Sequence, residues 1–73
     1  MQRVMVGVGG MTCEHCVRAV TKALQGLDGV GEVKVDLAGG KAEIEFDPAT
    51  VGLVDFERAI ADEGYQYQGP LNG

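Results

Sequence analysis

The sequence predicts an α+β fold, in which a four-stranded antiparallel sheet carries two helices on one face. Three observations support this prediction: apolar residues alternate with polar ones in some segments, they recur with a helical period in two others, and glycine or proline separates the segments. The chain has 73 residues, of which 45% are hydrophobic and 23% charged, as in compact globular proteins. We expect a single domain over residues 1–73.

The first third of the chain is expected to hold a strand and a helix. Residues 4–8 carry a valine at every second position and end at a Gly-Gly pair, which predicts a strand followed by a loop. The apolar period then changes to that of a helix, expected over 14–25 and ended by Gly26 and Gly29. The residues on its apolar face are Val17, Val20, Leu24 and Leu27.

The middle of the chain has the alternation of a β-hairpin. Residues 31–37 and 41–46 each place apolar side chains at every second position, and Ala38-Gly39-Gly40 connects the two runs as a turn. The other side of both strands carries charged residues, which an exposed sheet face requires. These residues are Glu32, Lys34, Asp36, Lys41, Glu43 and Glu45.

The last third is expected to hold a second helix and an edge strand. Asp47-Pro48 ends the hairpin, and a helical period then runs up to Gly64, a C′ glycine. Residues 65–68 are long enough for one edge strand before Gly69-Pro70. The order β-α-β-β-α-β is that of the ferredoxin-like sandwich. The apolar residues of the second helix are Leu53, Phe56 and Ile60.

Charge and hydropathy exclude several kinds of partner. Eleven acidic and six basic residues give a formal charge of −5, and the basic residues are scattered, so nucleic acid is not expected as a partner. No apolar run approaches the roughly 20 residues of a membrane span, and the N-terminus has no secretory h-region. We therefore expect a cytoplasmic protein without membrane insertion, whose cysteines stay reduced.

Both cysteines lie in one short segment, Cys13-Glu14-His15-Cys16. In the expected topology this segment joins the first strand to the first helix, so both sulfurs lie at a helix N-terminus. Unpaired amides and the positive end of the helix dipole favour anions there. Thiolate, the form that metals and redox chemistry use, is therefore expected.

Several kinds of site use a C-x-x-C pair. A structural zinc site and an iron–sulfur cluster usually take four protein ligands, which a single copy does not supply, and c-type haem needs a histidine where Val17 stands. A dithiol oxidoreductase also begins a helix after a strand, and it stays open together with a pair of inert thiols. The absence of tryptophan, and of proline near the thiols in sequence, favours metal binding.

Two thiolates suit copper(I) best among the metals. Soft sulfur ligands select this ion, which accepts two-coordinate geometry, whereas harder divalent ions are poorly served by so few donors. Two-coordination also leaves room for a third thiolate from a partner, which can attack before the first bond breaks. The pair therefore suits a carrier that hands its metal over.

The run Gly10-Met11-Thr12-Cys13-Glu14-His15-Cys16 resembles the GMTCxxC motif of heavy-metal-associated domains, found in copper chaperones and copper-transporting P-type ATPases. The resemblance extends over nearly the whole chain, to Gly64-Tyr65. It implies that Cys13 and Cys16 bind copper(I) and pass it to an ATPase domain of the same fold. Tyr65 stands where bacterial chaperones commonly carry tyrosine, which favours a bacterial soluble copper(I) chaperone.

Four other residues are expected near the metal without binding it. Met11 matches the family's methionine, which is tucked under the loop as an apolar tether. Thr12 favours copper, because zinc-selective members often carry an acidic residue there. His15 is expected to be exposed and non-ligating, although it could tune the thiolates or ligate in an oligomer. Tyr65 could hydrogen-bond near a sulfur or serve only as a half-buried aromatic.

We therefore predict a copper(I) chaperone, not an enzyme, that delivers copper to the metal-binding domain of a P-type ATPase by thiolate exchange. It is expected to be a monomer without metal, and copper could bridge two copies. The alternatives are a small dithiol redox protein, an isolated module of a heavy-metal ATPase, and a mercury- or zinc-binding relative.

Overall fold

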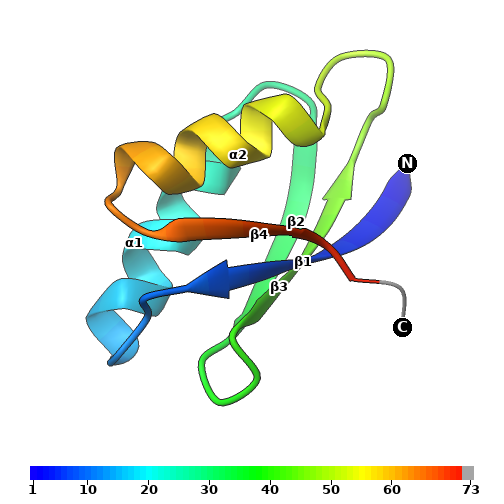
Figure 1. The fold of residues 1–73 in the computed structure, drawn as a ribbon. Coiled ribbons are helices and arrows are strands. Elements are labelled where there is room, and N and C mark those ends of the chain that lie inside the picture. The colour runs from blue at the N-terminus through cyan, green and yellow to red at the C-terminus, as the bar shows by residue number, and fades with distance from the viewer. Residues whose placement is uncertain (72–73) are drawn as a thin grey trace.

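The computed structural model describes residues 1–71 and contains the predicted elements in the predicted order. They are β1 (Gln2–Gly9), α1 (Glu14–Gln25), β2 (Val30–Asp36), β3 (Lys41–Phe46), α2 (Leu53–Asp62) and β4 (Gln66–Pro70). The antiparallel sheet has the strand order β2-β3-β1-β4, and both helices cover one of its faces (Figure 1). The ferredoxin-like α+β fold is confirmed. No helix within residues 1–71 is both long and apolar enough to cross a membrane.

The core lies between the helices and the covered face of the sheet. Val20 and Leu24 of α1 are fully buried, as are Phe56 and Ile60 of α2, so both helices bury the apolar face that their sequence period predicts. The Phe56 ring meets Phe46 of β3 edge to face, with ring centroids 5.1 Å apart and an interplanar angle of 86°. This aromatic contact fastens α2 to the sheet.

Leu53 shares the helical spacing of Phe56 and Ile60, but it is 38% exposed and lies outside the buried face of α2. It is the first residue of α2, and Val51, just before the N-cap Gly52, is buried in its place. Val51 and Phe56 thus occupy the two positions of a hydrophobic staple. The Gly52 amide donates a hydrogen bond of 2.9 Å to the Asp55 carboxylate, which ties the start of the helix to the preceding loop.

The prediction that the last strand spans 65–68 is wrong at both ends. β4 runs from Gln66 to Pro70, and Tyr65 belongs to the turn before it. Gly69 has φ +89 beside a shift in the β1–β4 register, and Pro70 is tolerated because β4 is an edge strand.

Smaller differences affect the ends of the first two strands, because sequence patterns predict the ends of an element less well than the element itself. β1 extends over Gln2–Gly9, beyond the expected 4–8. β2 covers Val30–Asp36 and not 31–37, which leaves Leu37 in the turn.

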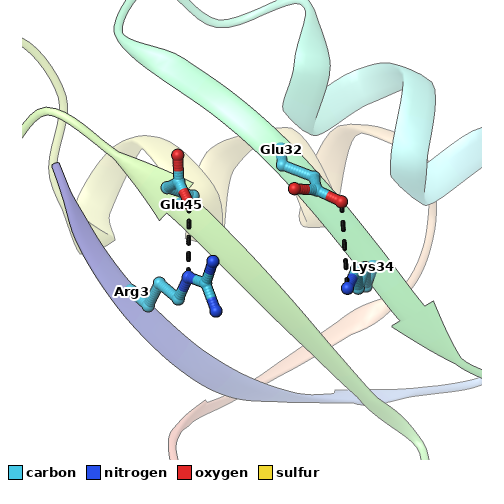
Figure 2. Close-up of polar contacts among 4 residues, drawn as sticks. All are labelled: Arg3, Glu32, Lys34 and Glu45. Atoms are coloured by element: carbon cyan, nitrogen blue, oxygen red, sulfur yellow. Dashed lines mark hydrogen bonds and ion pairs between the residues drawn. The ribbon is translucent and has the colours of Figure 1, made fainter.

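The open face of the sheet carries the predicted rows of charged side chains. Figure 2 shows Arg3 of β1 beside Glu45 of β3, with Nε and Oε2 3.2 Å apart, and Lys34 beside Glu32 on β2, with Nζ and Oε1 3.8 Å apart. Arg3 and Glu45 are direct cross-strand neighbours. Because these pairs are in contact with water, they contribute little to stability.

Candidate metal centre

The two cysteines lie where β1 ends and α1 begins, at one end of the molecule (Figure 1). Cys13 is the N-cap of α1, with an extended backbone, and its side chain makes no capping hydrogen bond. Cys16 lies in the first helical turn, and its amide donates to the Cys13 carbonyl over 3.0 Å. Both cysteines are free thiols; Cys13 is exposed and Cys16 half-buried. This placement agrees with the prediction that both sulfurs lie at a helix N-terminus.

The Sγ atoms of Cys13 and Cys16 are 3.9 Å apart. Two metal–thiolate bonds of about 2.3 Å in a straight line would separate the sulfurs by about 4.6 Å, so a linear site requires them to move apart by less than about 1 Å. A disulfide would require them to approach to about 2.05 Å. The reduced pair therefore lies nearer to the geometry of a two-coordinate ion than to that of a disulfide.

Hydrogen bonds lower the pKa of Cys16 from the ordinary 9.0 to about 6. The largest contribution is the backbone amide of Thr12, followed by the Tyr65 hydroxyl and the Cys13 amide, while partial desolvation opposes them. The Thr12 hydroxyl oxygen lies 3.8 Å from the Cys16 sulfur and adds a smaller effect. Cys16 is therefore a thiolate at neutral pH, as predicted, although the donors belong to the loop and to Tyr65 and not to the helix itself.

Tyr65 reaches the thiols because of the way α2 ends. Gly64 has φ +86, its amide donates to the Ala61 carbonyl (2.9 Å), and the Tyr65 amide donates to the Ile60 carbonyl (3.2 Å). These bonds form a Schellman motif, which turns the chain away from the helix. Hydrogen bonding to the Cys16 sulfur raises the pKa of Tyr65 to about 12, so the phenol keeps its proton.

Gly10 lets the cysteine loop pass close to Tyr65. It has φ +92, a conformation that favours glycine, and a Cβ at this position would lie 3.5 Å from the Tyr65 ring. The preceding residue, Gly9, opposes Gln66 in the β1–β4 ladder, which brings the two segments side by side. The Gly-Gly pair could have indicated such a close approach. The amides of Thr12 and Cys13 could not be identified in this way, because every residue except proline carries the same backbone amide.

The remaining expected residues surround the pair. Met11 is half-buried and packs against the core, whereas Thr12, Glu14 and His15 are exposed. Across residues 1–71, no group of three or more His, Cys, Asp or Glu side chains is placed to hold a metal ion. The two sulfurs are therefore the candidate ligands that a single copy offers.

Comparisons with known proteins identify the family of the chain. A sequence model of the heavy-metal-associated domain matches residues 6–66. The copper chaperone CopZ of Bacillus subtilis (strain 168) is 43% identical over 65 residues, which cover 89% of this chain and 94% of that protein. The copper chaperone CopZ of Staphylococcus aureus (strain bovine RF122 / ET3-1) is 37% identical over 65 residues, covering 89% and 96%.

Among solved structures, a copper binding domain from HMA7, a P-type ATPase, superimposes with a TM-score of 0.93 at 36% identity, covering 99% of this chain and 96% of that one. Since the family's sequence model and these relatives span most of its length, the chain belongs to the heavy-metal-associated domain family.

Proposed function

We propose that this protein is a cytoplasmic copper(I) chaperone that carries one ion between Cys13 and Cys16. The observation that carries the proposal is the pair of reduced sulfurs 3.9 Å apart, of which Cys16 is already a thiolate at neutral pH. Relatives that are 37% and 43% identical are named copper chaperones. The protein is then a metal carrier and not an enzyme.

Binding is expected to need little rearrangement. The Cys16 thiolate can take the soft cation first, because its loop and Tyr65 donors hold it in place. The Cys13 sulfur, which makes no capping hydrogen bond, then completes the two-coordinate site. Tyr65 keeps its own proton, because its pKa is raised to about 12.

Delivery to the metal-binding domain of a P-type ATPase would proceed by exchange of thiolates. Cys13 is exposed and Cys16 is half-buried, so an incoming thiolate would reach the ion from the side of Cys13. A third sulfur–copper bond forms, the bond to Cys13 breaks, and the exchange is repeated at Cys16. Copper remains monovalent throughout, because each sulfur bond that breaks is replaced by another. The same exchange with a second copy would give a copper-bridged dimer in place of the metal-free monomer.

Anaerobic titration of the reduced protein with copper(I), in competition with a chromophoric chelator, tests the proposal. We expect one ion per chain, and we expect Cys13→Ser or Cys16→Ser to abolish tight binding while the circular dichroism spectrum is unchanged. His15→Gln, an exposed neighbour inside the motif, is the control and should bind normally. Tight binding that survives loss of a cysteine, or an X-ray absorption spectrum dominated by nitrogen or oxygen, would refute the proposal.

A dithiol redox protein is the second candidate, because the lowered pKa of Cys16 would serve it equally. It would reduce a model disulfide catalytically and show no strong preference for copper(I). Stronger binding of zinc or mercury in a direct competition would instead favour the other metal-binding relatives.

A further inference from the structure

Two glycines interrupt the row of side chains that β1 presents on the open face of the sheet. The residues of this row are Arg3, Met5, Gly7 and Gly9, because the valines between them point to the core. Gly7 is buried, although it has no side chain and belongs to a face in contact with water. Gly7 and Gly9 thus form a recess in the open face, which a neighbouring segment must cover.

The side chain of Gln68, on β4, lies in this recess. A Cβ atom added at Gly7 would lie 3.0 Å from the Cβ of Gln68 and 3.1 Å from its Oε1, and one added at Gly9 would lie 2.7 Å from its Nε2. A single unbranched side chain therefore runs along β1 from one glycine to the other. It occupies the space in which two side chains of β1 would otherwise stand.

This contact lies where the pairing of β4 with β1 is irregular. β4 is an edge strand, so β1 is its one neighbour in the sheet, and the register between the two shifts within residues 6–8. The shift sets both Gln68 and Gly69 opposite Gly7, as in a β-bulge. A slip by one residue would turn Gln68 to the covered face and Tyr67 to the open one. A filled recess opposes this slip.

The register of β4 also determines where Tyr65 lies. Tyr65 immediately precedes β4, whose first residue, Gln66, is paired with Gly9. The next residue of the cysteine loop, Gly10, passes close to the Tyr65 ring. The Tyr65 hydroxyl is one of the groups that lower the pKa of Cys16. Tyr65 is therefore held from one side by the end of α2 and from the other by the start of β4.

We propose that Gln68 is a positioning residue: by filling the recess at Gly7 and Gly9, it fixes the register of β4 that holds Tyr65 beside Cys16. Its effect on copper(I) binding rests on the proposed function, whereas its effect on the register does not. Gln68 acts through Tyr65, since the groups that lower the pKa of Cys16 include Tyr65 and not Gln68.

A double-mutant cycle tests this role, with copper(I) affinity measured in competition with a chromophoric chelator. Gln68→Ala should weaken binding by about threefold, less than the roughly 10–100-fold that partners in contact with a metal ligand contribute, because it acts one contact further away. In a Tyr65→Phe background the same change should have no effect, since no hydroxyl is left to position. Equal losses in both backgrounds would overturn the proposal, because Gln68 would then not act through Tyr65.

Three further substitutions test whether the recess itself matters. Gly9→Ala displaces the amide of Gln68 and should weaken copper(I) binding as Gln68→Ala does. Gly31→Ala is the matched control: it is also a strand glycine, but the nearest atom to its added Cβ is the flexible end of Met1, at 3.0 Å, so binding should be normal. Gln68→Met, which is equally long and unbranched, should bind as the wild type does. Normal binding by Gly9→Ala, or a loss in Gln68→Met equal to that in Gln68→Ala, would contradict the proposal.

NMR of the metal-free protein tests the register without copper. The wild type should show cross-strand contacts between Gly9 and Gln66. In Gln68→Ala these contacts should weaken and the ring signals of Tyr65 should shift, whereas Gly31→Ala should retain both. Unchanged contacts and ring signals in Gln68→Ala would overturn the inference. Failure of the wild type to bind copper(I) would refute the proposed function, and these spectra would still decide whether Gln68 sets the register.

Discussion

Cys13 and Cys16 have different surroundings although they lie in one helical turn. Cys16 is half-buried, and its pKa is lowered by the backbone of Thr12, the Tyr65 hydroxyl and the backbone of Cys13, whereas Cys13 is exposed and its side chain makes no capping hydrogen bond. The more strongly held thiolate is suited to anchor an ion, and the freer sulfur is suited to exchange it. In this account the two positions of the motif are chemically unequal.

Tyr65→Phe should raise the pKa of Cys16 above its present value of about 6, because the second-largest contribution to its lowering is the Tyr65 hydroxyl. The pKa should stay below 9.0, since the amides of Thr12 and Cys13 remain. Titration of thiolate absorbance in a Cys13→Ser background, where Cys16 alone titrates, measures the change. Tyr67→Phe is the control, because the Tyr67 hydroxyl is buried without a hydrogen-bond partner among the described residues. Identical titrations of the two Phe variants would contradict the role of Tyr65.

Cys16 also makes the stability of the metal-free protein depend on pH. Its pKa is about 6 in the fold against an ordinary 9.0, so its contribution to stability is complete above pH 9 and is lost as the pH falls towards 6. The urea concentration at the unfolding midpoint should therefore decrease as the pH is lowered from 9 to 6. The midpoint of Cys16→Ser should fall less over the same range. If the two profiles run parallel, the thiolate of Cys16 does not stabilise the fold.

At the scale of secondary structure, the site depends on how its helices begin and end. α1 begins at a cysteine that leaves its sulfur free, and α2 ends in a Schellman motif that directs Tyr65 towards that sulfur pair. Strand pairing between Gly9 and Gln66 holds these two ends together. The metal centre is thus assembled from element termini and not from element interiors.

Gly64→Ala should destabilise the protein by roughly 1–2 kcal/mol, because Gly64 has φ +86 and an L side chain is strained there. No heavy atom lies within 4 Å of the added Cβ, so the cost comes from the backbone alone. Urea denaturation measures it, and the displaced Tyr65 should also raise the pKa of Cys16.

Gly52→Ser provides the comparison, because Gly52 has φ −140 and equally open space around it. Serine is favoured at an N-cap, so no loss of stability is expected there. Equal losses in the two variants would show that the conformation of Gly64 does not matter.

For the whole molecule, stability depends on a small core in which α2 is held to the sheet. Phe56 is fully buried and packs edge to face on Phe46. Because domains of this kind are stable by only about 5–15 kcal/mol, the loss of one such ring is a large fraction of the total. The metal centre needs this core, since Tyr65 is positioned by the end of α2.

Phe56→Ala should cost about 3–5 kcal/mol, and Phe56→Leu less than about 2 kcal/mol because it leaves a smaller void. Urea denaturation gives both values, and copper(I) titration should show normal binding by the folded Leu variant. If Phe56→Ala were as stable as the wild type, contacts other than the Phe46–Phe56 pair would hold α2 to the sheet.

Local patterns were sufficient for much of the fold. The bounds of α1 and β3 follow from apolar periods that change sharply at glycine or at Asp47-Pro48. The end of β4 was missed because Gly69-Pro70 is usually a terminator, yet an edge strand tolerates both residues. The helical period includes Leu53 but does not reveal that this first residue of α2 stays exposed.

By itself, the sequence determined the fold class, the family motif and the presence of two thiols at a helix start, because all three depend on residue types at short spacing. The tertiary structure alone decided which groups lower the pKa of Cys16, that the Tyr65 hydroxyl is one of them, and that α1 and α2 leave a groove between them. The reason is physical: backbone amides are the same in every residue, and contacts between distant segments depend on how strands pair and helices end.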